Sequence, residues 1–387
     1  MAMTFMLLRT FILTSSMVFS RQRLSRVKTD GRVILFPTTV SPSQKLIARG
    51  PNEDTNTRWI AHVHGWIFEP EEKSLKRRAF ISLLRTVFDI EKTDEASDIL
   101  RRRARSFLVD NDRGKRLSVR IGGENGLVVN LPRSRANGHF RKTVKLNNHD
   151  IMAALKLPGD MYNESLYNIK RTAPITLITP EDDDREFSGI IHFLPLTGLS
   201  VISDIDDTVK ISNVLDKKSL LRTTFLEDFV PVPGMSDLFK TWEKNIDASF
   251  HLHFVSAAPW QLYEELSNFL NAQGFPQATF HLRSMRLKDK TILNLFRSPL
   301  KEKMSTIESI LETYPERQFV LVGDSGEKDP ECYGEILRRH PNQVKKAFIR
   351  NVTNETKSCI RFTIAFAGLG NELWELFDDA SKVGPPI

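Results

Sequence analysis

The chain has 387 residues, of which 40% are hydrophobic and 27% are charged, with 19 glycines and 19 prolines. This composition is typical of globular proteins and excludes a disordered, collagen-like or low-complexity chain. Neither of the two cysteines, Cys332 and Cys359, belongs to a pair with metal-binding spacing. This excludes a disulfide scaffold and a cysteine-ligated zinc site. The length predicts two folded units, and the net charge of +7 favours encounters with anionic surfaces without specifying any chemistry.

Residues 1–29 form an N-terminal segment apart from the predicted domains. Residues 1–20 are apolar and rich in serine and threonine, Arg9 interrupts them, and three arginines precede the first acidic residue, Asp30. We interpret this segment as a disordered or processed tail. The alternatives are a secretory or organellar targeting signal, a short membrane-associating stretch and a wrongly assigned start codon. No apolar run reaches the roughly 18 residues that a membrane-spanning helix needs.

Residues 30–186 are predicted to form a β-rich N-terminal domain. Runs of β-branched and aromatic residues typical of strands lie at 32–37, 58–68, 117–121 and 127–131. Helical spacing of apolar residues predicts a helix at 73–88. We interpret the basic residues at 101–105 as a solvated helix face, with a lipid-docking patch as the alternative. His62 and His64 share one strand face, and we expect a structural role for them because no third metal ligand is nearby.

Beyond an acidic cluster at 181–184, apolar runs alternate with helical segments. The predicted strands lie at 187–205, 250–255, 319–322 and 345–349, and helices begin at Trp260 and Glu331. This alternation predicts an α/β domain with a parallel sheet and helices on both faces. We place this domain at 187–355, which leaves 356–387 as a C-terminal extension. Ligands of such sheets bind at the carboxyl ends of the strands.

Carboxylates collect where the first predicted strand of this domain ends. The strand leads into Asp204, Asp206, Asp207 and Thr208. Three acids so close together after an apolar strand need a cation or a basic partner, and Mg²⁺ fits because it takes oxygen ligands and pairs with phosphate. One carboxylate can attack phosphorus while another transfers protons. An acidic turn that caps a helix would be the preferred interpretation if this motif stood alone.

Further polar residues lie at the ends of later strands. Ser256 precedes a predicted helix, where a hydroxyl and backbone amides can hold a phosphate. Asp324 and Asp329 lie on a glycine-containing loop, and Lys303 offers a counter-charge to carboxylate and phosphate. Taken singly, these residues are a helix cap, turn formers and a surface lysine. Their order at successive strand ends indicates one phosphate-handling site.

The order Asp204-x-Asp206-x-Thr208, Ser256, Lys303 and Gly323-Asp324 to Asp329 resembles the four signatures of the haloacid-dehalogenase superfamily of phosphotransferases. Longer segments resemble the catalytic domain of the actin-patch-associated, Mg²⁺-dependent phosphatidate phosphatase family; they lie at 198–210, 256–263, 280–283 and 323–331. Residues 32–37 and 110–140 resemble the N-terminal portion of such proteins. The resemblance implies a haloacid-dehalogenase-like, Rossmannoid parallel sheet behind a β-rich N-terminal domain.

The resemblance also implies a catalytic role for each of five residues. Asp204 would be the nucleophile that forms an aspartyl-phosphate, and Asp206 would be the general acid and base. Thr208 and Ser256 would hold phosphoryl oxygens. Lys303 would neutralise the nucleophile and the phosphate, which otherwise repel each other.

Mg²⁺ is the cofactor that the resemblance implies. The residues assigned to the metal site are Asp204, Asp206 through its carbonyl, Asp324 and, as a supporting acid, Asp329. One departure from the pattern is Glu302, which stands before Lys303 where relatives have a histidine. Asp207 has no derived role beyond shaping the loop.

Taken together, the residues and the resemblance predict an enzyme that hydrolyses phosphatidate to diacylglycerol and phosphate at a membrane surface. The first alternative keeps this chemistry but changes the substrate to another lipid phosphate or a soluble phosphomonoester. The second is a scaffold without turnover, against which the intact aspartates argue. We expect a cytoplasmic or peripheral membrane location and no specific nucleic-acid partner, because no dedicated motif is present.

The segment 209–242 is expected to form a small cap over the site. Its apolar stretches at 224–226 and 229–231 are equally suited to contact a lipid tail or to join the core. Which of the two they do depends on the fold.

Overall fold

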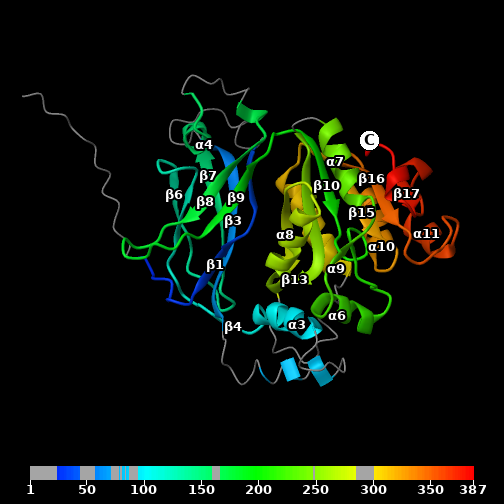
Figure 1. Cartoon of the computed structure of the whole chain (residues 1–387). Helices are drawn as coiled ribbons and strands as arrows, with labels where there is room; N and C mark the ends of the chain where they lie inside the picture. The colour runs from blue at the N-terminus through cyan, green and yellow to red at the C-terminus, as the bar shows by residue number, and fades with distance from the viewer. Residues whose placement is uncertain are drawn as a thin grey trace, which may run out of the picture.

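The structure is a computed structural model that describes residues 24–43, 57–70, 78, 81–82, 84–86, 95–158, 166–246, 249–284 and 300–387. Residues 1–23 of the expected tail and most of the helix expected at 73–88 lie outside this range. Two large sheets dominate the fold, one strand-rich and N-terminal, the other parallel and covered by helices (Figure 1). These features confirm the predicted α/β class with a parallel sheet and a strand-rich N-terminal region.

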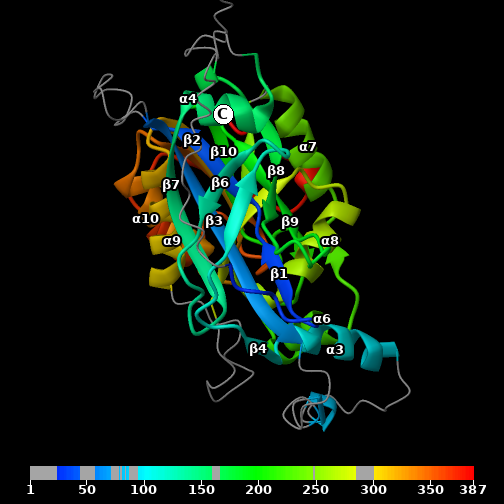
Figure 2. The same cartoon turned by 90° about the vertical axis from the view of Figure 1, so that its left-hand side faces the viewer.

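The first sheet contains nine strands in a mostly antiparallel arrangement. The long strand β3 (Thr57–Pro70) runs within this sheet, as Figure 2 shows, and pairs with β1 (Arg32–Leu35), β2 (Thr38–Pro42), β4 (Val109–Asn111) and β7 (His139–Asn147). The other strands are β5 (Ser118–Ile121), β6 (Leu127–Asn130), β8 (Arg171–Leu177) and β9 (Ser188–Phe193). Helix α4 (Asn148–Leu155) begins at a capping box in which Asn147 and Asp150 exchange hydrogen bonds.

The strand-like run predicted at 187–205 is two strands in two different sheets. Strand β9 pairs with β2 and β8 in the first sheet, whereas β10 (Gly198–Ser203) lies in the second. Pro195, which lacks a backbone N–H, interrupts the run, and Gly198 adopts a φ of 124° that favours glycine. The prediction of one continuous strand-like run was therefore wrong.

The second sheet has six parallel strands in the order β14-β13-β10-β15-β16-β17. Its later strands are β13 (His251–Pro259), β14 (Ala278–Arg283), β15 (Arg317–Asp324), β16 (Val344–Arg350) and β17 (Trp374–Phe377). Strand β17 comes from the expected C-terminal extension and forms an edge of this sheet. The order of strands reverses at β10, and open sheets of this kind bind ligands at the carboxyl ends of the strands beside such a reversal.

Helices cover both faces of the parallel sheet. Because alternate strand residues point to opposite faces, Val201 packs with α7 and α8 on one side, and Ile202 packs with α9, α10 and α11 on the other. These helices are α7 (Met235–Asn245), α8 (Tyr263–Ala272), α9 (Leu300–Thr313), α10 (Asp329–Arg339) and α11 (Ile360–Ala365). None of the helices in the described ranges is both long and apolar enough to cross a membrane.

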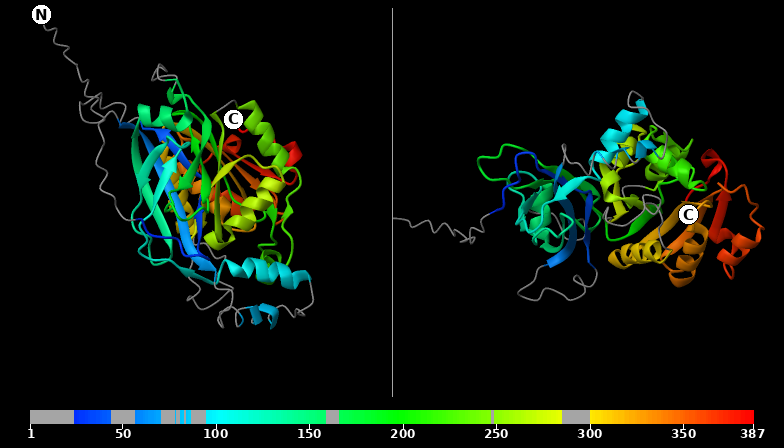
Figure 3. Two further views of the ribbon diagram at one scale, coloured as in Figure 1. Left: turned by 60° about the vertical axis from the view of Figure 1, so that its left-hand side comes forward. Right: turned by 90° about the horizontal axis from the view of Figure 1, so that it is seen from below.

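A short link, residues 194–197, joins the two sheets, which lie side by side when the molecule is seen from below (Figure 3). Arg317 is buried beside this link. Its guanidinium donates hydrogen bonds to the carbonyl oxygens of Pro195 (3.0 Å), Thr197 (2.8 Å) and Leu199 (2.9 Å), and to Ser200 Oγ (3.0 Å). The fixed geometry of a guanidinium means that this side chain holds the link in one conformation.

Helix α3 (Glu95–Arg105) leaves the first sheet and packs beside α6 (Lys217–Phe225) at one end of the parallel sheet (Figure 1). Arg102 is 56% exposed and pairs with Glu265. Arg103, by contrast, is 2% exposed and donates to three carbonyl oxygens at the end of α6, those of Thr223, Thr224 and Glu227. The expected solvated face is therefore wrong for Arg103, because it satisfies the free carbonyls of a neighbouring helix end.

Candidate active site

The predicted site residues converge at the carboxyl ends of β10, β13 and β15, and all of them are buried. Asp204 follows β10 directly, and its backbone N–H donates to the Val322 carbonyl (2.9 Å), which continues the pairing with β15. Asp324 is the last residue of β15, so the two carboxylates come from adjacent strands. Parallel strands thus place these acids together although they are 120 residues apart in the sequence.

Lys303, from α9, lies between two of the carboxylates. Its Nζ is 3.0 Å from Asp204 Oδ1 and also forms an ion pair with Asp329 Oδ1. Burial opposes a charge on this lysine, but the two carboxylates raise the pKa of Lys303 well above its ordinary value. The ammonium is therefore charged and neutralises part of the acidic group.

Asp204, Asp324 and Asp329 form an acidic triad, in which one carboxylate oxygen from each residue lies within 4.8 Å of the others. Asp204 Oδ2 and Asp324 Oδ2 are buried and accept no hydrogen bond from the described residues. Burial, followed by repulsion from Asp329, raises the pKa of Asp324 well above its ordinary value, and burial does the same to the pKa of Asp204 against the opposing effect of Lys303. Two orphaned oxygens and surplus negative charge fit a hard divalent cation.

The loop after β15 holds the triad in place. Asp324 Oδ1 accepts hydrogen bonds from the backbone N–H groups of Gly326 (2.6 Å) and Glu327 (3.1 Å). Asp329 opens helix α10 and approaches Gly323 so closely that a Cβ there would lie 2.2 Å from Asp329 Oδ2. Glycine at 323 is thus a requirement of the triad, because a larger residue would displace Asp329.

Asp206 belongs to a different set of contacts. Its Oδ1 lies 2.7 Å from Lys210 Nζ and accepts a hydrogen bond from Ser212 Oγ (2.7 Å), while Oδ2 lies 3.4 Å from Ser256 Oγ. Burial works to raise the pKa of Asp206, but Lys210 and the two hydroxyls outweigh it and lower this pKa. Asp206 is therefore ionised, and its carboxylate lies outside the acidic triad.

Lys210 and Ser212 were missed by the sequence analysis, although one signal was available. Lys210 stands between the apolar residues Val209 and Ile211, and a lysine that is buried requires an acidic partner. The partner four residues earlier is Asp206. Recognising the pair from the sequence would have required knowing that the chain turns back at Asp207.

Asp207 shapes that turn, in agreement with the loop-shaping role considered for it. Its φ of 50° lies in the left-handed region, which aspartate tolerates better than most residues. Its carboxylate accepts hydrogen bonds from the backbone N–H groups of Ser212 (2.7 Å), Asn213 (3.1 Å) and Val214 (2.6 Å). The side chain therefore fastens residues 212–214 beside the site.

Part of the expected cap at 209–242 lies over the loop of Asp324. A Cβ on Gly326 would lie 2.6 Å from Val214 Cγ2 and 3.6 Å from Leu215 Cδ2, so these two side chains contact that loop. Phe225 and Leu226 are fully buried in the core, which decides the choice left open for the stretch 224–226 in favour of core packing. Within the segment, the strands β11 (Lys210–Ile211) and β12 (Val230–Pro231) pair in an antiparallel arrangement.

The remaining predicted residues, Thr208 and Ser256, present hydroxyls. Thr208 Oγ1 is buried without a hydrogen-bond partner among the described residues. Ser256, near the carboxyl end of β13, accepts a hydrogen bond from the Ala258 N–H (3.0 Å). A small cavity of about 60 Å³ opens between Ser256 and Lys303, so a polar group can enter between the hydroxyl and the ammonium.

Two glutamates differ in their relation to the site. Glu327, which the sequence analysis missed, lies on the loop of Asp324, and burial raises its pKa to about 7. Glu302 is half exposed, pairs with Arg283 (3.6 Å), and lies with it at the rim of the small cavity beside Ser256 and Lys303. Glu327 adds a further negative charge that a cation at the triad would offset.

Comparison with known proteins finds similarity in the part of the chain that contains the parallel sheet. Residues 199–351 match the family model described as phosphatidate phosphatase APP1, catalytic domain. The chain is 32% identical over 186 residues to phosphatidate phosphatase APP1 of Saccharomyces cerevisiae, which covers 46% of the chain and 31% of that protein. It is 30% identical over 195 residues to the uncharacterized protein C29B5.04c of Schizosaccharomyces pombe, covering 49% of the chain and 31% of that protein.

The chain therefore spans about a third of the length of the curated relatives it matches. Among solved structures, a ferredoxin-NADP⁺ reductase from Plasmodium falciparum aligns with 83% of the chain at 8% identity and a TM-score of 0.19, and no argument rests on so low a score.

Proposed function

Because residues 199–351 match the family model of the phosphatidate phosphatase APP1 catalytic domain, we propose that this chain hydrolyses phosphatidate to diacylglycerol and phosphate. The observation that carries the proposal is the buried acidic triad with Lys303 at the carboxyl ends of β10 and β15. The matched segment contains every residue of that group. The strand order, with acids at its reversal, supports a haloacid-dehalogenase-like fold for the domain built on the parallel sheet, which begins at β10.

The first step assigns Asp204 as the nucleophile. Lys303 orients its Oδ1 as the attacking oxygen, while Oδ2, which accepts no hydrogen bond from the described residues, stays available for the metal. Attack on phosphorus forms a bond from Asp204 to the phosphoryl group and breaks the bond to the diacylglycerol oxygen. Thr208 and Ser256 hold phosphoryl oxygens, and water then attacks the aspartyl-phosphate to release phosphate.

Asp206 transfers the protons in this scheme. Since its pKa is lowered, it is ionised before substrate binds and accepts a proton from the monoanionic phosphate group. It delivers that proton to the departing diacylglycerol oxygen. In the second step, it accepts a proton from the attacking water. Lys210 and Ser212 keep the carboxylate in place throughout.

Mg²⁺ is the metal that best fits the donor set. Asp204, Asp324 and the Asp206 carbonyl would hold it, and Asp329 would support the site while it orients Lys303. When bound, the ion offsets the negative charges of nucleophile and phosphate. The fit rests on the two orphaned carboxylate oxygens of the triad.

The substrate is a membrane lipid, so we propose that the protein works from the cytoplasm in peripheral contact with a membrane. The first alternative retains the same residues and acts on another lipid phosphate or a soluble phosphomonoester. A scaffold without turnover explains neither the buried, repelling carboxylates nor the lysine between them.

Phosphate release from phosphatidate in mixed micelles tests the proposal. We expect release with Mg²⁺, none with EDTA, and little from a soluble phosphomonoester. Asp204→Asn and Asp206→Asn should each abolish release, whereas Asp237→Asn, on the exposed surface of α7, should not. Release from the soluble ester alone would move the substrate to the first alternative, and release by Asp204→Asn would refute the aspartyl-phosphate mechanism.

A further inference from the structure

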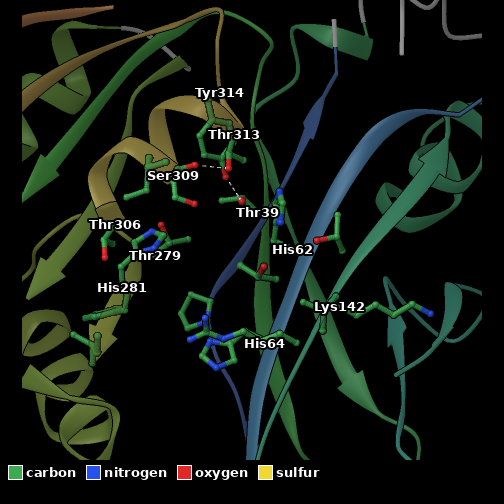
Figure 4. A pocket seen from close by; sticks show the side chains of 18 of the residues that line it. Thr39, His62, His64, Lys142, Thr279, His281, Thr306, Ser309, Thr313 and Tyr314 are labelled. Atoms are coloured by element: carbon green, nitrogen blue, oxygen red, sulfur yellow. Dashed lines mark hydrogen bonds between the residues drawn. The ribbon is translucent and has the colours of Figure 1, made fainter. Parts of the chain in front are cut away.

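A second and larger cavity, of about 490 Å³, lies between the two sheets. Its walls come from β2, β3 and β7 on one side and from β14, α9 and Trp260 on the other. In Figure 4, His62 from β3 and His281 from β14 lie on opposite walls. The volume lies in the range of small-molecule sites, roughly 300–1,000 Å³. Neither wall alone could enclose a ligand, because the cavity exists only where the sheets meet.

The lining of this cavity mixes polar and apolar side chains and contains no carboxylate among the described residues. Hydroxyls come from both sides, including those of Thr39, Thr143, Thr306, Ser309 and Tyr314. Arg141, on the exposed part of β7, forms no hydrogen bond or ion pair with any residue in the described ranges, whereas Lys142 turns its ammonium to the Asn130 carbonyl (2.5 Å). A cation without a counter-charge among hydroxyls favours an anionic, hydroxyl-bearing ligand.

Three buried nitrogens of the lining residues lack partners among the described residues. They are His62 Nε2, His281 Nε2 and Trp260 Nε1. Trp260 is only 2% exposed, so its indole N–H depends on a partner from within the protein or from the contents of the cavity. Leaving such groups unsatisfied is costly, which is why a cluster of them around one cavity indicates a bound polar molecule.

The cavity borders the active site. His281, Leu282 and Thr306 line both this cavity and the small cavity that contains Ser256 and Lys303. The two spaces thus share a wall made of β14 and α9. A molecule in the larger cavity would contact elements that also position Lys303, although it would occupy a separate place.

We propose that the cavity between the sheets binds a phosphorylated polyol. Arg141, the indole N–H of Trp260 and the imidazoles of His62 and His281 in their Nε2–H tautomers would receive the phosphate, and the surrounding hydroxyls would pair with those of the polyol. The ligand is either a free molecule or the headgroup of a lipid, since both present the same chemistry. This proposal does not depend on the catalytic activity of the chain.

Isothermal titration of the full chain with inositol monophosphate tests the proposal for a free ligand. Flotation with phosphatidylcholine vesicles that contain phosphatidylinositol phosphate tests it for a headgroup. Binding in either assay, with no binding of unphosphorylated inositol or of plain phosphatidylcholine vesicles, is the expected result. Failure of both assays would overturn the proposal, and so would equal binding of the unphosphorylated probes.

Variants locate the bound probe. Arg141→Gln should weaken binding about tenfold or more, as expected for the loss of a charged hydrogen bond. The matched control is Lys145→Gln, which removes a charge from the same exposed strand outside the cavity and should leave binding unchanged. Binding should also survive in Asp204→Asn. Binding that Arg141→Gln leaves intact, or that Asp204→Asn abolishes, would place the probe elsewhere and overturn the assignment.

Discussion

Lys210 and Asp206 form a buried ion pair four residues apart, with Nζ 2.7 Å from Oδ1. The pair fixes the charge of a carboxylate that burial alone would tend to neutralise. It also ties the first residues after the catalytic strand to the start of the covering segment. Both the charge and the position of Asp206 therefore depend on a residue outside the acidic triad.

Replacing Lys210 with methionine should destabilise the protein and remove its activity. Breaking a buried pair by removing one partner typically costs about 3–5 kcal/mol, because the other charge is left uncompensated. Urea denaturation measures this loss. In Lys210→Met/Asp206→Leu, where neither charge remains, most of the stability should return while phosphate release stays absent. If the double variant is no more stable than the single one, the pair does not hold Asp206 as described.

Asp324→Asn should make the metal-free protein more stable. The substitution removes one of the repelling carboxylates of the triad yet keeps a side-chain oxygen for the N–H groups of Gly326 and Glu327. We expect the free energy of unfolding in EDTA to rise by about 0.5–2 kcal/mol, the usual range for a stabilising substitution that improves the charge distribution. Thermal unfolding in EDTA measures it.

Mg²⁺ provides the complementary measurement on the same variant. A metal that binds only the folded state should stabilise the parent protein, by about 2.7 kcal/mol at a hundred times its dissociation constant. Asp324→Asn should lose this response. If Mg²⁺ does not raise the unfolding temperature of the parent protein, the metal assignment is contradicted.

Asp207→Ala should destabilise the protein, because it releases residues 212–214 from their hydrogen bonds to the Asp207 carboxylate. The change removes three hydrogen bonds to backbone N–H groups and leaves those groups without their acceptor, which costs about 1–3 kcal/mol. Asp207→Asn should cost less, because asparagine tolerates the left-handed backbone and retains an accepting oxygen. Denaturation curves of the two variants give the comparison, and equal losses would argue against the role of the accepting oxygen.

Arg103 and Arg102 offer a matched pair of adjacent arginines. Arg103→Ala should destabilise the protein by about 3 kcal/mol or more, because it removes a buried side chain and frees the carbonyls at the end of α6. Arg102→Ala removes an exposed ion pair and should cost at most about 1 kcal/mol. Similar losses for both would restore the solvated-face interpretation of this helix.

Buried histidines should make the protein sensitive to mild acid. Burial lowers the pKa of His139 to about 3 and the pKa of His192 to about 4. The unfolded chain takes up these protons below about pH 6.5, whereas the folded chain does not. Stability is therefore complete above pH 6.5 and declines toward pH 4, by about 1.4 kcal/mol per pH unit for each group.

Urea denaturation between pH 7 and pH 5 tests this dependence. His192→Gln should flatten the decline, whereas the same change at the exposed His149 should not. A decline that is identical in both variants would assign the acid sensitivity to other groups.

The site residues that could be predicted from the sequence are the polar residues that end an apolar strand or follow it. Asp204, Asp324 and Ser256 stand out because each interrupts or ends a strand pattern, and parallel strands bring their carboxyl ends to one edge. Lys210 did not stand out. It pairs with Asp206 only because the backbone turns through a left-handed conformation at Asp207, which the sequence does not specify. A pattern of residue types predicts which groups collect at an edge better than it predicts which of them pair.

The fold, like the site, could be predicted in part from the sequence. Alternating strands and helices predicted the parallel sheet, but β9 and β10 are separated only by a short link, and an apolar pattern does not tell to which sheet a strand belongs. The burial of Arg103 depends on helix α6, which is more than a hundred residues away in the sequence and cannot be inferred from the periodicity of α3. Strand β17 lies in the segment that the sequence analysis left as a C-terminal extension.

The hold of Arg317 on the link between the sheets makes that link a fixed joint rather than a hinge. Many two-part enzymes close around a substrate by swinging one half toward the other. The link of residues 194–197 lacks that freedom, so we expect the two sheets to keep their relative positions when phosphate binds. Small-angle scattering should accordingly give the same dimensions with and without bound phosphate.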